Sequence, residues 1–200
     1  MRDLTTLWFD KDGVLAQYDY RIYEPVYGAP APWKIRNTHI YRGIEPYEDM
    51  CAAVRKLYGE VSNVHPDKRF CNIRVLTAVC DGVTLSEHVI DGMYWCKKHL
   101  DLSESDFFAC AVSKENIPID LHAEINSLQI LFDDYMPNLR KWRDVGGTAV
   151  KVLNGINTCT QEFPCLPGLE SKEYIYALLK QIVTDVENQQ QLKTGILNVR

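Results

Sequence analysis

The stretch LTTLWFDKDGV, residues 4–14, ends a run of apolar side chains with two carboxylates only two positions apart. Asp10 and Asp12 follow the apolar residues directly, and Gly13 comes next. Two like charges at the end of a buried strand repel each other and lose hydration. Such a pair is typical of a site that holds a cation or transfers a proton. The rest of the chain must therefore supply a charge or a reaction that explains the pair.

Four further apolar runs are as short as the first and are bounded by polar or turn-forming residues: 72–77, 107–112, 128–132 and 148–153. Runs of this kind are typical of parallel strands that are buried on both faces. Helical patterns lie between them, at 86–99, from Pro137 to a Gly-Gly stop, and from Ser171 onward. This alternation predicts an α/β fold, a doubly wound parallel five-stranded sheet.

One segment interrupts the alternation, because no convincing strand occurs between residues 16 and 70. It begins rich in aromatic residues and proline, and it contains one helical pattern that starts at Pro46 and stops at Gly59. The segment is too long for a simple crossover connection. We therefore expect a core formed by residues 1–15 and 71–200, with residues 16–70 inserted as a small, mainly helical cap.

Composition and charge exclude several classes of protein. The net charge of −5 and the lack of any Lys/Arg block argue against a stable nucleic-acid partner. No stretch is long and apolar enough for a membrane span, and the charged N-terminus does not resemble a signal peptide. The seven cysteines form no Cys-x-x-Cys pair, so we expect reduced thiols in a cytoplasmic protein. We expect either a monomer or a homodimer.

In doubly wound sheets, ligands bind beyond the carboxyl ends of the strands. Charged and polar residues lie at the carboxyl ends of four of the predicted strands. Asp10 and Asp12 follow the first strand, Thr77 ends the second, Lys114 follows the third, and Asp133-Asp134 end the fourth. Four carboxylates could not all stay ionised together without a cation. Mg²⁺ prefers oxygen ligands and is typically bound through one or two carboxylates with a substrate phosphate. The sequence therefore predicts a Mg²⁺ site.

The set DKDGV, Thr77, Lys114 and FDD resembles the four motifs of the haloacid dehalogenase superfamily, whose commonest members are Mg²⁺-dependent phosphatases. The resemblance covers roughly residues 4–15 and 72–153. The phrase LFDDYMPNLRKWRDVGGTAVKVLNGIN, residues 131–157, is similar to the closing half of bacterial and phage 5'(3')-deoxyribonucleotidase-like proteins. Those proteins also carry a small helical cap after the first motif.

The resemblance implies phosphoryl transfer through an aspartyl-phosphate, with Asp10 as nucleophile and Asp12 as general acid and base. Asp10, Asp12 (through its backbone carbonyl), Asp133 and Asp134 would hold Mg²⁺. The substrate phosphate would contact Gly13, Thr77, Ala78 and Lys114. Of these, Thr77 and Lys114 are also expected to be catalytic residues. Alternatives from the residues alone are a strand residue for Thr77, a surface lysine for Lys114, and a helix cap for Asp133-Asp134.

The inserted segment holds seven of the eleven tyrosines. Aromatic rings above a phosphate site could stack a nucleobase, and we expect Tyr18, Tyr20 or Tyr23 to contact the substrate. The alternative is that these rings fill a small core. Asn154 and Asn157, after the last strand, are interpreted as turn residues. All five histidines are interpreted as structural or solvated.

Taken together, these residues predict a Mg²⁺-dependent phosphomonoesterase acting on a small phosphorylated substrate, with a nucleoside or deoxynucleoside monophosphate as the leading candidate. A second possibility keeps the chemistry but changes the ester to a sugar phosphate, another metabolite or a polynucleotide end. A third is a non-catalytic module that binds Mg²⁺ or phosphate.

Overall fold

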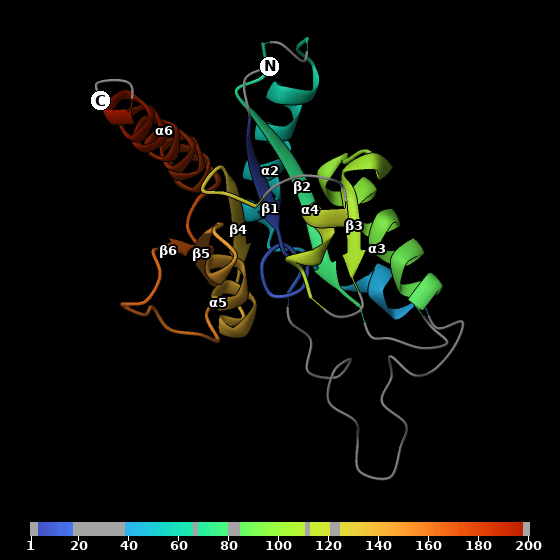
Figure 1. Cartoon of the computed structure of the whole chain (residues 1–200). Helices are drawn as coiled ribbons and strands as arrows, with labels where there is room; N and C mark the ends of the chain where they lie inside the picture. The colour runs from blue at the N-terminus through green and yellow to red at the C-terminus, as the bar shows by residue number, and fades with distance from the viewer. Residues whose placement is uncertain are drawn as a thin grey trace.

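The computed structural model describes residues 4–17, 39–65, 68–79, 85–110, 113–120 and 125–197. Its centre is a parallel sheet of six strands in the order β3-β2-β1-β4-β5-β6 (Figure 1). The strands are β1 (Thr5–Phe9), β2 (Cys71–Ala78), β3 (Phe107–Cys110), β4 (Gln129–Asp133), β5 (Thr148–Leu153) and β6 (Cys165–Pro167). The five predicted strands are confirmed within a few residues at each end.

The sixth strand is a correction to the five-stranded prediction. β6 has only three residues and pairs with β5 at the edge of the sheet. Its proline has no backbone N–H to donate, which a central strand would not tolerate but an edge strand does. A run this short carries no periodic pattern, so the sequence does not predict it.

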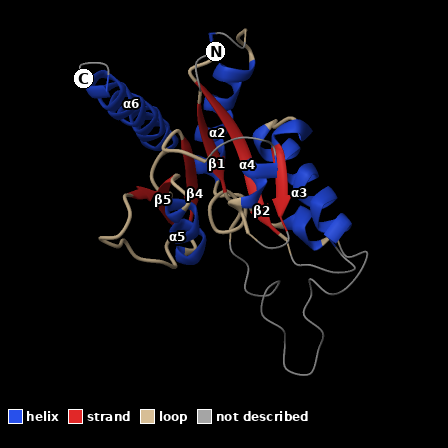
Figure 2. Cartoon of the chain, viewed as in Figure 1, coloured by secondary structure: helices blue, strands red, loops and turns tan. Residues whose placement is uncertain are grey.

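Helices cover both faces of the sheet, as the doubly wound prediction requires (Figure 2). α2 (Glu48–Ser62), α3 (Leu85–Leu100) and α6 (Lys172–Leu197) share one hydrophobic cluster with Leu7 and Phe9 of β1. α5 (Met136–Asp144) packs on the opposite face, together with the short α4 (Asn116–Asp120), around Trp8. Because successive side chains of a strand point to opposite faces, β1 is buried on both sides.

The buried face of α3 combines apolar side chains with a carboxylate. Ile90 and Tyr94 are more than half exposed, whereas Trp95, Cys96 and Leu100 are buried. Asp91 is buried as well. Its carboxylate accepts hydrogen bonds from Arg42 Nε at 2.6 Å and pairs with His39 Nδ1 at 2.9 Å. A pattern that counts only apolar residues cannot find a face that includes a paired carboxylate.

One helix of the predicted cap segment packs on the core. α2, which was expected in the cap, packs against α6, α3 and β2, and its buried stripe belongs to the main core. The chain leaves the core near residue 17 and re-enters it near residue 45, where the two backbone segments are hydrogen-bonded. Gln17 N–H donates to Glu45 O, and Tyr47 N–H donates to Leu15 O, both at 2.8 Å. The connection between these points includes the 3-10 helix η2 (Ile40–Gly43). Residues 18–38, on which the rest of the cap prediction falls, lie outside the described residues.

The expectation of reduced thiols is wrong at two cysteines. Cys159 and Cys165 form a disulfide across a short loop that places their Cα atoms 6.1 Å apart. The free cysteines among the described residues are Cys51, Cys71, Cys96 and Cys110, all of them buried. Within the described ranges, none of the helices combines the length and the apolar character that crossing a bilayer requires.

Candidate functional site

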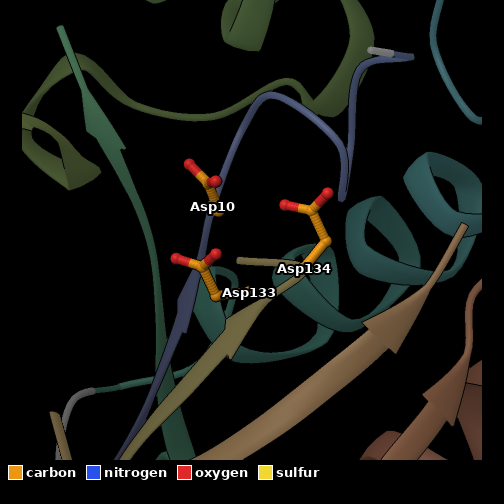
Figure 3. A group of neighbouring side chains, drawn as sticks. All are labelled: Asp10, Asp133 and Asp134. Carbon is orange, nitrogen blue, oxygen red and sulfur yellow. The ribbon is translucent and has the colours of Figure 1, made fainter. Parts of the chain in front are cut away.

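The carboxylates of Asp10, Asp133 and Asp134 meet at the carboxyl ends of β1 and β4 (Figure 3). β1 and β4 are adjacent, and Asp10 N–H donates to Phe132 O at 2.9 Å, which holds the two strand ends in register. One oxygen from each of the three carboxylates lies within 4.8 Å of the others. Oxygen atoms gathered this closely form the kind of group that binds a hard divalent cation.

Lys114 is buried between two of these carboxylates. Its Nζ lies 2.8 Å from Asp10 Oδ1 and 2.7 Å from Asp133 Oδ2, and its side chain is 2% exposed. The sequence alone left a surface lysine as an alternative, and the structure excludes it. The long side chain reaches the site because the turn between β3 and α4 lies at the same edge of the sheet as β1.

Asp133 is held by further donors in the turn after β4 and on α5. Its Oδ2 also accepts a hydrogen bond from Asn138 Nδ2 at 2.9 Å, and its Oδ1 accepts one from the backbone N–H of Tyr135 at 2.8 Å. α5 has no side-chain capping hydrogen bond at its first residue, so the helix-cap alternative is not supported, and Asp133 lies in the carboxylate group.

The electrostatics show that one ammonium does not balance the carboxylates. Burial raises the pKa of Asp10 well above its usual value, the Lys114 ammonium opposes this, and Asp133, Asp12 and Asp134 raise it further. Burial and the Asp133 charge also raise the pKa of Asp134 to about 6, which the hydrogen bond from Asn154 partly offsets. For Lys114, burial lowers the pKa, but Asp10 and Asp133 outweigh burial and raise it above the usual value. A bound cation would reverse the effect on the carboxylates.

These shifts predict a pH dependence of stability in the metal-free protein. The pKa of Asp134 is about 6 when folded and 3.8 when unperturbed, so between these values the folded state binds more protons than the unfolded chain. The free energy of unfolding should therefore fall as pH rises from about 4 to about 6, by up to about 3 kcal/mol for this group. Urea unfolding in EDTA across that range measures it. The fall should be smaller in Asp134→Asn, and an undiminished fall would contradict the assignment.

Gly13 lets Asp134 approach the loop that follows β1. Its φ of +86° lies in the left-handed region, and a Cβ at this position would lie 2.5 Å from Asp134 Oδ2. Asn154 closes the same contact from β5, because its Nδ2 donates to Gly13 O at 2.8 Å and to Asp134 Oδ2 at 3.0 Å. Asn154 also makes the turn that the Asn-Gly pattern predicts, since its Oδ1 accepts a hydrogen bond from Ile156 N–H.

Gly13→Ala should therefore destabilise the protein, because it combines a strained φ with a direct clash against Asp134. We expect a loss of about 2–3 kcal/mol in the free energy of unfolding, measured with urea. Gly59→Ala is the matched control. Gly59 lies inside α2, and a Cβ there would meet no atom within 4 Å, so alanine should stabilise by about 0.5–1 kcal/mol. Equal effects of the two substitutions would contradict this account.

A pocket opens beside the carboxylates, on the side of β2. Of the predicted site residues, Asp12, Thr77 and Ala78 line it. Lys11, Tyr41, Val79, His88 and Gly92 complete the lining. Tyr41 comes from η2, His88 from α3, and their rings meet edge to face at 4.3 Å. His88, which was expected to be structural or solvated, is thus a buried residue that also borders the pocket.

The predicted site residues are therefore gathered in two adjoining places. Asp10, Asp133, Asp134 and Lys114 form the charged cluster, and Asp12, Thr77 and Ala78 line the pocket next to it. Gly13 follows Asp12 in the chain and lies against Asp134, so it stands between the pocket and the charged cluster. Tyr18 and Tyr20, together with Tyr23, lie outside the described residues. Of the other tyrosines in the inserted segment, Tyr58 is bound to Asp106 and packs on the core, as the alternative interpretation proposed.

The sequence matches no model of a known protein family, and it has no significant match among curated protein sequences. Solved structures do resemble it. The D,D-heptose 1,7-bisphosphate phosphatase of B. bronchiseptica, complexed with magnesium and phosphate, superposes with a TM-score of 0.54 at 12% identity, covering 89% of this chain and 99% of that one. This chain shares the fold of that phosphatase.

Two weaker structural similarities are also found. The corresponding phosphatase of Burkholderia thailandensis gives a TM-score of 0.48 at 11% identity, covering 88% of this chain and 98% of that one. A Had-superfamily hydrolase of Ehrlichia chaffeensis gives 0.49 at 9%, covering 92% and 99%. The α/β fold implied by the sequence resemblance is confirmed by the first comparison, and none of the three proteins is described as a deoxyribonucleotidase.

Proposed function

We propose that the protein is a Mg²⁺-dependent phosphomonoesterase of the haloacid dehalogenase type, acting through an aspartyl-phosphate. The observation that carries this proposal is the buried cluster of Asp10, Asp133 and Asp134 around Lys114, at the carboxyl edge of a parallel sheet and beside a pocket. The shared fold with a phosphatase that binds magnesium and phosphate supports it.

In this proposal Asp10 is the nucleophile. Its Oδ1 accepts hydrogen bonds from Lys114 Nζ and from the backbone N–H of Lys11 at 2.7 Å, so Oδ2 is the oxygen that attacks phosphorus. A bond forms between Asp10 and phosphorus as the bond to the ester oxygen breaks. Lys114 holds Asp10 in its ionised form and balances charge on the transferred group.

Asp12 is the general acid and base. Its carboxylate borders the pocket together with Thr77, where the leaving group of a bound ester would lie. Asp12 gives a proton to the leaving oxygen in the first step and takes one from the attacking water in the second. The Thr77 hydroxyl, at the end of β2, donates a hydrogen bond to a phosphoryl oxygen, and Ala78 offers its backbone N–H.

The donor set fits Mg²⁺, because it consists of carboxylate oxygens and carries more negative charge than Lys114 balances. Asp10, Asp133, Asp134 and the backbone carbonyl of Asp12 would hold the ion. Asp133 Oδ1 accepts one hydrogen bond from the described residues and so retains a lone pair. When bound, Mg²⁺ would neutralise charge on the phosphate and relieve repulsion among the carboxylates.

A nucleoside or deoxynucleoside monophosphate remains the leading substrate. Two aromatic side chains, Tyr41 and His88, line the pocket beside the carboxylates, and aromatic side chains stack on nucleobases. Sugar phosphates, other metabolites and polynucleotide ends are the alternatives, and the same pocket would admit a small polar leaving group.

Phosphate release from a panel of nucleoside monophosphates and sugar phosphates tests the proposal. Each ester is assayed with Mg²⁺ and with EDTA, beside an Asp10→Asn control. Release that needs Mg²⁺ and disappears in the variant supports the reaction, and the preferred ester gives the substrate class. Release from no ester above the Asp10→Asn background contradicts it and favours a non-catalytic module that binds Mg²⁺ or phosphate.

A further inference from the structure

The lysine between the two site aspartates is buried and held by groups from three parts of the chain. The Lys11 side chain is 2% exposed, and its ammonium contacts Asp12 Oδ1. The same ammonium lies 5.4 Å from the centre of the Trp95 ring on α3 and 5.7 Å from the centre of the Tyr41 ring on η2. Both distances are within the range of a cation–π interaction. Tyr41 and Trp95 are called the aromatic box below.

The aromatic box is itself fixed by the fold. Trp95 Nε1 donates to the backbone carbonyl of Ile44 at 2.7 Å, and this bond is buried. Tyr41 packs edge to face on His88. Because both rings are held in place, the position of the ammonium is fixed as well, and so is the Asp12 oxygen that the ammonium contacts.

Stability does not explain a charged residue at this position. A buried ion pair loses hydration, and replacing both of its partners by well-packed apolar residues of similar volume is often neutral or stabilising. A charge that adds little to stability but contacts a carboxylate at the edge of the pocket points to a role in the reaction.

We propose that Lys11 is a positioning residue, which holds one oxygen of Asp12 so that the other faces the leaving group in the pocket. This inference rests on the proposed function, in which Asp12 passes a proton to the ester oxygen as the phosphorus–oxygen bond breaks. Lys11 and Asp12 both line the pocket, so the ion pair and the reacting oxygen share one site. Lys11 links the aromatic box of η2 and α3 to the acid without touching phosphorus.

The need for this proton depends on the leaving group. An alkoxide, as from a nucleotide or a sugar phosphate, leaves poorly unless it is protonated, whereas the phenolate of an activated aryl phosphate leaves without help. The value of kcat/KM includes only the steps through phosphorylation of Asp10, so it excludes the later attack by water. Misplacing Asp12 should therefore lower kcat/KM for alkyl esters much more than for aryl esters.

The experiment compares kcat/KM of Lys11→Met and wild type on the best alkyl ester of the panel and on p-nitrophenyl phosphate, with Mg²⁺. We expect a loss of about 10²-fold on the alkyl ester and less than about 5-fold on the aryl ester. Asp12→Asn should show the same selectivity. The double variant should be little worse than Asp12→Asn alone, because Lys11 acts through Asp12.

Two controls separate positioning from folding. Lys11→Met leaves Asp12 without its partner and should lower the melting temperature, whereas the double variant with Asp12→Asn removes both charges and should melt no lower than wild type. Lys11→Gln provides the same kinetic comparison if the methionine variant does not fold. Lys97→Met removes an exposed lysine of α3, which pairs with Asp101 at 2.5 Å. It should leave kcat/KM unchanged on both esters. Equal losses on both esters, or no loss, would overturn the role of Lys11. Failure of wild type to release phosphate from any ester would instead overturn the proposed function.

Discussion

Replacing Asp10 by Asn is expected to abolish phosphate release, by about 10⁴-fold or more in kcat, while the protein stays folded. The amide keeps the shape of the carboxyl group and can still accept a hydrogen bond from Lys114, but it cannot attack phosphorus. Steady-state kinetics on the preferred ester measure the effect. Because burial and three neighbouring carboxylates raise the pKa of Asp10, the substitution also removes a repelling charge. The melting temperature without Mg²⁺ should therefore not fall.

A matched substitution on the neighbouring strand separates loss of the nucleophile from loss of a contact. Thr77→Val keeps the shape of the side chain and removes one hydroxyl at the end of β2. We expect it to lower kcat/KM by about 10–100-fold, as the loss of one hydrogen bond to the transferred group does. Residual activity of Asp10→Asn as high as that of Thr77→Val would contradict the role of Asp10 as nucleophile.

Replacing Lys114 by Met should have the second largest effect, and it should act on both stability and activity. Lys114 is the buried partner of Asp10 and Asp133, so its loss leaves two carboxylates without that cation. Breaking a buried ion pair in this way costs about 3–5 kcal/mol. For a chain of this size the melting temperature should fall by about 10 °C. Differential scanning calorimetry in EDTA measures the fall.

Lys151→Met is the control for this result. Lys151 is also a buried lysine, but its Nζ donates to a backbone carbonyl, that of Thr158, at 2.7 Å. Its removal therefore separates the loss of a buried amine from the loss of a carboxylate's partner, and it should cost less than Lys114→Met. Combining Lys114→Met with Asp10→Asn should recover part of the loss, because one unpaired charge is then gone. A Lys114→Met protein as stable as wild type would contradict the buried ion pairs.

The residues that follow the strands were predictable from the sequence because of a simple rule. Apolar runs identify the strands, and the carboxyl ends of parallel strands meet at one edge. Asp10, Asp133 and Asp134 therefore had to lie together once β1 and β4 were identified as neighbours. The position of the Lys114 ammonium was less predictable, because the residue follows β3 and its side chain is long and flexible. The sequence therefore allowed a surface position, which the structure excludes.

Other parts of the structure depend on tertiary contacts that no local pattern contains. The helical stripe of α2 shows that the helix buries one face, but not that this face packs on the sheet rather than within a cap. Asn154 contacts Asp134, although its local sequence fits a simple turn residue equally well. Lys11 contacts Asp12, although its local sequence fits a solvated lysine equally well. Asp91 interrupts an apolar face because Arg42, far away in sequence, pairs with it.

The central claim is that Asp10 becomes phosphorylated, and trapping that intermediate tests it most directly. The protein is mixed with Mg²⁺ and a ³²P-labelled form of its best ester, quenched in acid within the first turnover, and digested for peptide mapping. We predict label on the peptide that contains Asp10, lost on treatment with hydroxylamine and absent in EDTA and in Asp10→Asn. Mg²⁺-dependent phosphate release without label on that peptide, or with label on another residue, would contradict the account.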